Sequence, residues 1–330
     1  MSAHLAKPLR CVIFMANLLT SVVGMFNVAL AAELIWSDDS GIHRLGIEPT
    51  HDQLVQITYD NSHVGLAIDV ATRTMYWSDV LPLGAPGPAG FIFGDRLSGG
   101  SRTTLVSNLN APGAVAYDSP NKSIYWTDTT ATLWQPDSIY VWAGEGASGK
   151  RILSDITISQ IGGIAIDEVH QQIYFTYVNP LIDSLFPGAV ARADLDGSNV
   201  QTIVSGLSQP QGIAIDPVGG EVFWADTRGA PDAGLGLIQA AALDGSGRRT
   251  VVGGLDYPVG VALDILSKDV YWTDMGTGKL QRTSMSGALP FLEDVRTNLP
   301  NPRSLVNVPE PTVAISMVLA ACYVLAQRRK

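Results

Sequence analysis

The strongest constraint on this chain is an internal repeat of 48 or 49 residues. Each copy has a first block of small and aliphatic residues that ends in an aspartate, and a second, aromatic block that ends ten residues later. The first blocks end at Asp69, Asp118, Asp167, Asp216 and Asp264; the second blocks are Tyr76-Trp77-Ser78-Asp79, Tyr125-Trp126-Thr127-Asp128, Tyr174-Phe175-Thr176-Tyr177, Phe223-Trp224-Ala225-Asp226 and Tyr271-Trp272-Thr273-Asp274. Because period, order and spacing agree, the chain is predicted to repeat one supersecondary unit.

The runs within each unit have the composition of β-strands. They are short and rich in β-branched and aromatic residues, and Gly, Pro, Asn or Asp separates them, as in 190–194 and 200–204 around the turn at 196–198. Four such strands fit in each unit. A four-stranded unit repeated around an axis is the blade of a β-propeller, which leaves only short strand edges exposed.

The two ends of the repeat region carry complementary half units. Residues 34–38 form a second block without a first block, and residues 299–306 match the segment 207–214 and so form a first block without a second. Together they predict one further blade, in which the C-terminal strand lies beside residues 34–38. The sequence therefore predicts an all-β, six-bladed propeller over residues 33–308, with the first blade closed by the C-terminal strand.

These blocks resemble the YWTD, or class B, repeats of the low-density lipoprotein receptor group, and the resemblance covers residues 34–306. It implies a six-bladed propeller in which the motif aromatic packs between blades and the motif aspartate holds neighbouring blades through backbone hydrogen bonds. It assigns these roles to Trp36, Trp77, Trp126, Phe175, Trp224 and Trp272, and to Asp38, Asp79, Asp128, Asp226 and Asp274. Tyr177 takes the place of the aspartate in the fourth blade, so the resemblance does not define how that blade is joined.

The N-terminal segment 1–32 has the pattern of a signal peptide. Lys7 and Arg10 precede an apolar run over residues 11–30, and Ala29-Leu30-Ala31 matches a cleavage site. The run is long for a signal peptide, so an uncleaved anchor is the alternative. Both interpretations predict an exported body.

The C-terminal segment 309–330 resembles the PEP-CTERM sorting signal of bacterial surface proteins. Pro309, Glu310 and Pro311 precede an uncharged stretch over 313–326, and the chain finishes with Arg328-Arg329-Lys330. The resemblance implies transient holding in the inner membrane, processing by an exosortase near the Pro-Glu-Pro, and a final place at the cell surface or outside the cell. The uncharged stretch is shorter than the roughly 20 residues of a spanning helix, so a plain tail anchor is the alternative.

Charge and cysteine content limit the classes of function that are expected for the body, residues 33–308. Residues 33–308 contain 16 basic and 30 acidic residues, a net charge of −14, which disfavours nucleic-acid binding through phosphate contacts and suits cationic partners. Both cysteines, Cys11 and Cys322, lie in the end segments. The body is therefore predicted to contain neither disulfides nor thiol chemistry.

No pattern in the sequence predicts catalytic residues, a metal site or a cofactor. The repeated aspartates occupy equivalent places in successive blades, whereas a catalytic site brings unlike residues to one point. Asp194-Leu195-Asp196-Gly197 resembles part of a calcium loop, but Asp-Gly between strands is the expected hairpin turn. The histidines show no zinc-binding spacing, and neither a nucleophile elbow nor a phosphate-binding loop occurs.

The connections that follow the second blocks differ in length. They are short in the first and sixth blades and long in the four blades between, over 80–90, 129–137, 178–187 and 227–236. All emerge on one face of a propeller, where they would form a wall that includes seven apolar residues: Leu81, Leu83, Trp134, Leu181, Ile182, Leu185 and Phe186. A soluble surface seldom gathers such residues without a binding role. The alternative is local packing of each loop on its own blade.

These features predict a non-enzymatic binding module for a protein or polysaccharide partner on the long-loop face, with His63, Tyr257 and Arg303 at the channel mouth. One alternative is a metal-dependent, lactonase-like propeller hydrolase. For that function Asp60 and Asp256 are the only acids near the entries of the inner strands, which is a thin ligand set. Another alternative is a structural component of an extracellular matrix.

Overall fold

A computed structural model of the chain describes residues 33–45, 52–56, 65–80, 90–129, 137–144, 149–155, 158–179, 187–227, 234–287 and 292–309. The chain divides into residues 1–31 and 32–330, and every described strand belongs to the second unit. The segments predicted as signal peptide and as sorting signal, apart from Pro309, lie outside the described residues. Within the described ranges, no helix has the length and apolar character needed to cross a membrane.

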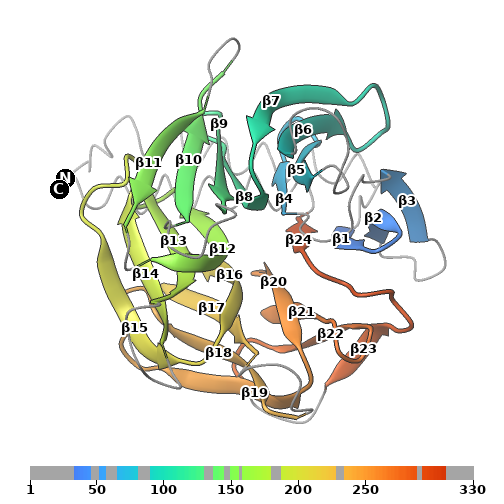
Figure 1. The fold of residues 1–330 in the computed structure, drawn as a ribbon. Coiled ribbons are helices and arrows are strands. Elements are labelled where there is room, and N and C mark those ends of the chain that lie inside the picture. Colours follow the sequence, from blue (N-terminus) through green and yellow to red (C-terminus); the bar gives the residue numbers. More distant parts are fainter. Residues whose placement is uncertain are drawn as a thin grey trace, which may run out of the picture. The chain divides into compact units, whose positions relative to one another are not determined.

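The described strands form six antiparallel sheets of four strands each, arranged as blades around an axis (Figure 1). From the inner to the outer strand, blade 1 contains β24 (Leu305–Val308), β1 (Glu33–Asp38), β2 (Gly41–Leu45) and β3 (Asp52–Gln56); blade 2 contains β4 (Leu66–Asp69), β5 (Thr74–Val80), β6 (Gly90–Arg96) and β7 (Thr103–Leu109); blade 3 contains β8 (Pro112–Asp118), β9 (Ser123–Asp128), β10 (Ser138–Trp142) and β11 (Lys150–Ser154). Blade 4 contains β12 (Ser159–Asp167), β13 (Gln172–Val178), β14 (Gly188–Asp194) and β15 (Gln201–Leu207); blade 5 contains β16 (Pro210–Asp216), β17 (Glu221–Asp226), β18 (Gly236–Ala242) and β19 (Arg249–Leu255); blade 6 contains β20 (Pro258–Asp264), β21 (Asp269–Asp274), β22 (Lys279–Ser284) and β23 (Glu293–Arg296). The predicted six-bladed, all-β fold with four strands per blade is confirmed.

The inner strands contact one another in the order β24, β4, β8, β12, β16, β20 and back to β24, which closes the ring. Small residues at the start of the first blocks permit this close approach. A Cβ atom on Gly65 would lie 2.2 Å from the carbonyl oxygen of Gly113, and one on Gly260 would lie 2.2 Å from that of Arg303. Real Cβ atoms do not approach backbone so closely, so these glycines are required where neighbouring inner strands meet.

Blade 1 is assembled from the two ends of the described chain. β24 pairs with β1 in antiparallel register from Glu33 opposite Val308 to Trp36 opposite Leu305, and the two strands lie side by side in Figure 1. The backbone N–H of Arg303 donates to the carbonyl oxygen of Ser37 at 2.8 Å. The two half repeats of the sequence therefore complete one sheet.

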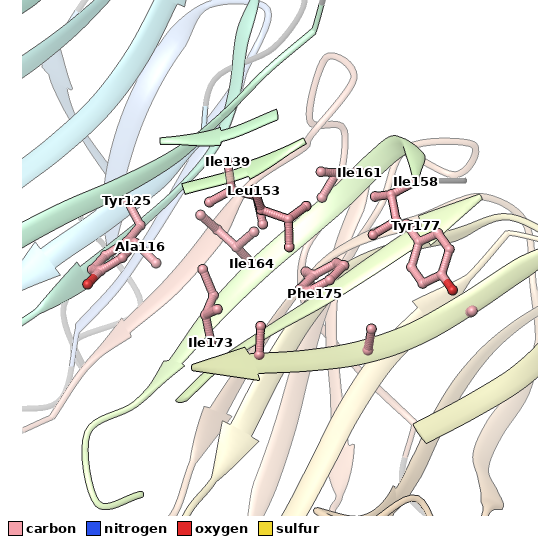
Figure 2. Close-up of a cluster of buried hydrophobic side chains, with 13 residues drawn as sticks. Ala116, Tyr125, Ile139, Leu153, Ile158, Ile161, Ile164, Ile173, Phe175 and Tyr177 are labelled. Carbon is pink, nitrogen blue, oxygen red and sulfur yellow. The ribbon is translucent and has the colours of Figure 1, made fainter. Parts of the chain in front are cut away.

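Among the described residues, the hydrophobic core consists of six clusters, each of which contains side chains from two neighbouring blades. The motif aromatics are fully buried in them, with exposed fractions of at most 1%. Trp77 packs with Ile35 and Ile42 of blade 1. Phe175 packs with Ile139 and Leu153 of blade 3, as Figure 2 shows. Each blade thus buries its motif aromatic against the preceding blade, and the same packing of Trp36 in a cluster with blade 6 joins the ends of the ring.

Candidate functional site: the channel mouth and its joints

The propeller has two unlike faces, which the path of the chain defines. The described entries into the inner strands and the described ends of the long connections lie on one face, here called the mouth face. The turns that follow each inner strand, including 70–73, 119–122, 168–171, 217–220 and 265–268, lie on the opposite face, here called the exit face. A functional surface on one face is therefore separated from the other by the length of an inner strand.

A cavity of about 440 Å³ opens at the mouth face around the axis. Its polar lining comes from the entries into the inner strands and from the ends of the long connections: Thr129, Asp137, Gln160, Gln209, Gln211, Tyr257 and Arg303. A second cavity of about 300 Å³ lies farther along the axis and is lined mainly by small and aliphatic residues of the inner strands, together with Tyr117 and Asn307. Gly65, Ala114, Gly162 and Ser304 border both cavities. The mouth cavity therefore combines these polar side chains with apolar wall residues such as Ile161, Val259 and Met275.

Two of the three mouth residues predicted from the sequence lie in this cavity. Tyr257 and Arg303 line it and are both half-buried. The Arg303 guanidinium lies 3.5 Å from a carboxylate oxygen of Asp39. His63 and the seven apolar residues predicted for the wall (Leu81, Leu83, Trp134, Leu181, Ile182, Leu185 and Phe186) lie outside the described residues. Their role in binding stays a prediction.

Three of the motif aspartates hold the connection that enters their own blade from the preceding blade. Asp226 accepts hydrogen bonds from the backbone N–H groups of Ser208 at 3.2 Å and Gln209 at 2.9 Å. Asp128 takes the two equivalent N–H groups of residues 110 and 111, and Asp274 those of 256 and 257. The residues that would correspond for Asp79, 61 and 62, lie outside the described part of the chain. In this arrangement a buried carboxylate satisfies backbone donors that have no strand partner.

Blade 4 obtains this carboxylate from a neighbour. The backbone N–H of Ile161 donates to Asp137 at 2.9 Å, and Asp137 belongs to blade 3, directly before β10. Tyr177, at the aspartate position, instead bonds through its hydroxyl to Thr202 at 2.8 Å. Ile161 occupies the position of Pro210 in blade 5, and so has an N–H that the proline lacks. The join that the resemblance left undefined is thus made by Asp137.

Asp137 is the acidic residue of the mouth lining that the sequence analysis did not identify. Its side chain is only 3% exposed. Burial raises the pKa of this carboxyl above its usual value, the backbone donors of Ile161 and Gln160 oppose the shift, and the nearby charge of Asp128 adds to it. The sequence indicates that this joint is irregular, because blade 4 has neither the motif aspartate nor the entry proline, but it does not indicate that Asp137 replaces the aspartate.

Blade 1 departs from the regular joint in the opposite way. Pro300 stands at the position of Ser208 and has no N–H to donate to Asp38. Asp38 is held by Ser40, through its backbone N–H at 2.8 Å and its hydroxyl at 2.6 Å, and by His43 Nε2 at 3.0 Å. Burial alone would raise the pKa of Asp38, but these hydrogen bonds outweigh it and lower the pKa below its usual value.

The third residue of the aromatic motif ties adjacent inner strands together, a role that the sequence analysis missed. The Ser78 hydroxyl accepts from the N–H of Gly65 in its own blade at 2.8 Å and donates to the carbonyl oxygen of Gly113 in the next blade at 2.6 Å. Thr273 makes the same pair of bonds, to Gly260 and to Arg303. The available signal was the recurrence of a hydroxyl at this position in Ser37, Ser78, Thr127, Thr176 and Thr273.

The aspartates of the exit face cap turns. Asp69 accepts from the N–H of Ala71 at 3.0 Å, and Asp216 from that of Gly219 at 2.7 Å. In the Asp194–Gly197 segment, Asp196 caps the turn through the N–H of Ser198 at 2.9 Å. Across the described ranges, no three His, Cys, Asp or Glu side chains are placed to hold a metal ion together.

Comparisons with known proteins show similarity at the level of the fold. No protein-family model and no curated protein matches the sequence. Among solved structures, a chain from a nidogen–laminin complex superposes with a TM-score of 0.67 at 20% identity, over 84% of this chain and 99% of that one. TolB from Acinetobacter baumannii gives a TM-score of 0.64 at 13% identity, over 84% and 67% of the two chains. A putative TolB from Agrobacterium tumefaciens gives 0.57 at 10% identity, over 81% and 89%. These likenesses establish a β-propeller shared with proteins of otherwise different sequence.

Proposed function

We propose that this protein is an exported binding module whose mouth face recognises a protein partner. The observation that carries the proposal is the open cavity of about 440 Å³ at the mouth, whose wall combines apolar residues with polar and charged side chains, among them Gln211, Tyr257 and Arg303. Such a hollow offers a protruding loop both apolar contact and directional hydrogen bonds, which is how recognition sites combine affinity with specificity.

The fold and the charge of the body support this function. One structure of similar fold comes from a complex of nidogen with laminin, so a propeller of this shape is compatible with protein recognition. The net charge of −14 over residues 33–308 favours a cationic partner surface. A polysaccharide partner and a matrix role remain alternatives from the sequence, and no contact in the described residues favours either over a protein.

We further propose that the end segments determine where the module works. The apolar run at 11–30 would direct export, and Pro309, Glu310 and Pro311 with the following uncharged stretch would hold the protein in the membrane until an exosortase processes it. Pro309 directly follows the last strand. Cleavage after it would therefore release the propeller with blade 1 still complete.

The proposed function is tested with substitutions on the mouth face. Tyr257→Ala together with Trp134→Ser, Leu185→Ser and Phe186→Ser should abolish the capture of a partner protein by the purified body from cell-surface extracts. Thermal unfolding should change little, because interface hot spots in loops seldom support the core. The matched control is Val218→Ser on the exit face, which should capture the same partner as the wild type. Equal capture by both variants, with unchanged melting, would refute recognition at the mouth.

A further inference from the structure

The two ends of the propeller leave it at one place on the exit face. Glu33, where β1 begins, is the register partner of Val308, where β24 ends. β24 runs away from the mouth, since Ser304 before it borders the mouth cavity whereas Val306 and Asn307 border only the deeper one. Both chain exits are thus separated from the mouth by the full length of an inner strand.

The exits connect to the apolar runs through very short links. Four residues separate Val308 from the uncharged stretch that begins at Val313, and two separate Leu30 from Glu33. An extended chain gains at most about 3.5 Å per residue, so the stretch at Val313 begins within roughly 17 Å of the end of β24. A membrane that holds this stretch must therefore lie close to the exit face.

The exposed apolar residues of the propeller gather on the same face. Among the described residues, five large hydrophobic side chains are exposed, and four of them lie in or beside turns of the exit face: Val200, Val218, Leu266 and Leu292. Val218 and Leu266 are 53% and 61% exposed and occupy equivalent turn positions in blades 5 and 6. The fifth, Leu235, lies on the mouth face. Exposed apolar tips beside a membrane tether suit the interface of a lipid bilayer.

We infer that the exit face rests on the bilayer surface and that the mouth face points away from the membrane. The apolar tips around Val218 and Leu266 contact the lipid headgroup region, while the mouth faces the medium. This inference rests on the proposed membrane holding, and it deepens that proposal by assigning one face to lipid and the other to the partner. Only the C-terminal tether is needed, so the inference holds whether or not residues 1–32 are removed.

The test compares the two ends of one inner strand in the full chain. Cys11→Ser and Cys322→Ser remove both native thiols, and a single cysteine is then introduced as Asn110→Cys on the mouth face or Ser119→Cys on the exit face. Both positions are exposed and flank β8, so fluorophores attached there report from opposite ends of a strand that is about 20 Å long. The protein is reconstituted in vesicles of phosphatidylcholine with a minority of phosphatidylglycerol, and a headgroup-attached nitroxide lipid serves as the quencher.

The expected result is strong quenching at position 119 and fluorescence at 110 close to that in quencher-free vesicles. Val218→Ser with Leu266→Ser should reduce the quenching at 119, whereas Leu235→Ser, the matched change on the mouth face, should not. Protein that floats with the vesicles but shows equal quenching at both sites, or more at 110, overturns the orientation alone. Protein that does not float overturns the membrane holding and the orientation with it. Unchanged quenching in the double serine variant overturns the contact made by the apolar tips.

Discussion

Blades 1 and 4 both lack the regular joint between blades, for opposite reasons. Blade 1 keeps the motif aspartate, Asp38, but Pro300 removes an N–H that the aspartate would bind. Blade 4 keeps the backbone donors but has Tyr177 in place of the aspartate. In each case the remaining buried group finds another partner: Ser40 and His43 hold Asp38, and Asp137 holds Ile161. What stays constant across the blades is therefore the pairing of buried polar groups, and not the residue that provides it.

The largest effect on stability is expected from removing the inner strand of blade 1, because blades 1 and 4 differ in how their inner strands are connected. In blade 4 the inner strand is linked to its neighbour by a hairpin, whereas in blade 1 only strand pairing and packing hold β24. Deleting residues 302–307 should abolish cooperative unfolding, because β1 becomes an open edge and Trp36 loses its cover. Circular dichroism and calorimetry measure this. The matched control removes residues 310–330, which leaves β24 intact and should not change the melting temperature; a wild-type melting curve for the 302–307 deletion would contradict the role of β24.

A double-mutant cycle tests whether Asp137 replaces the missing aspartate of blade 4. Asp137→Ala should cost about 1–3 kcal/mol in the free energy of unfolding, because the buried N–H of Ile161 and the N–H of Gln160 lose their acceptor. Tyr177→Asp alone should also destabilise, because it loses the ring and places a second carboxylate near the first. Combined, the two changes should cost at least about 1 kcal/mol less than their sum, since the new aspartate accepts the freed donors. Additive costs in denaturant titrations would show that the two positions do not substitute for each other.

The smallest expected effect is the pH dependence of stability. Its sign should differ between the carboxylates that serve the joints of blades 1 and 4. The pKa of Asp38 is lowered, so its contribution to stability is present above pH 3.8 and is lost as the pH falls through the folded-state pKa. The pKa of Asp137 is raised, so its contribution is present below pH 3.8 and is lost as the pH rises through the folded-state pKa.

The advantage of the wild type over Asp38→Asn should therefore shrink on acidification, and its advantage over Asp137→Asn should grow. The two changes should have opposite signs, because the two pKa values are shifted in opposite directions. Free energies of unfolding of the wild type and both variants, measured across the acidic range, test this prediction. Parallel pH profiles for the two variants would contradict the opposite pKa shifts of Asp38 and Asp137.

The sequence predicted the fold well because the fold is repeated. Six copies of the motif aromatic and two half repeats identify the blades and the closing strand, and each prediction rests on several independent spacings. The hydroxyl groups that tie adjacent inner strands together, as in Ser78 and Thr273, recur as regularly as the tryptophans, but they were not among the predictions from the sequence. A signal present in five of the six second blocks could have been recognised from the sequence.

The candidate site was predicted less completely because it depends on differences between the blades. Tyr257 and Arg303 were found from their positions at the entries of the inner strands. Asp137 was not, because it acts across a blade boundary, and its partner Ile161 lies 24 residues away in the chain. Only the three-dimensional neighbourhood shows that the loss of an aspartate and of a proline in one blade is balanced by a carboxylate in another.

The pairing of Glu33 with Val308 has a mechanical consequence. The two strands of this pair are antiparallel, and both chain ends leave from the same end of it. Hydrogen bonds between antiparallel strands lie perpendicular to the strands, so tension applied through the two ends loads them one after another, beginning at Glu33. When the two ends are pulled apart, the hydrogen bonds between β1 and β24 break in sequence, so the ring opens at low force. Tension between one end and a distant blade would have to shear whole sheets.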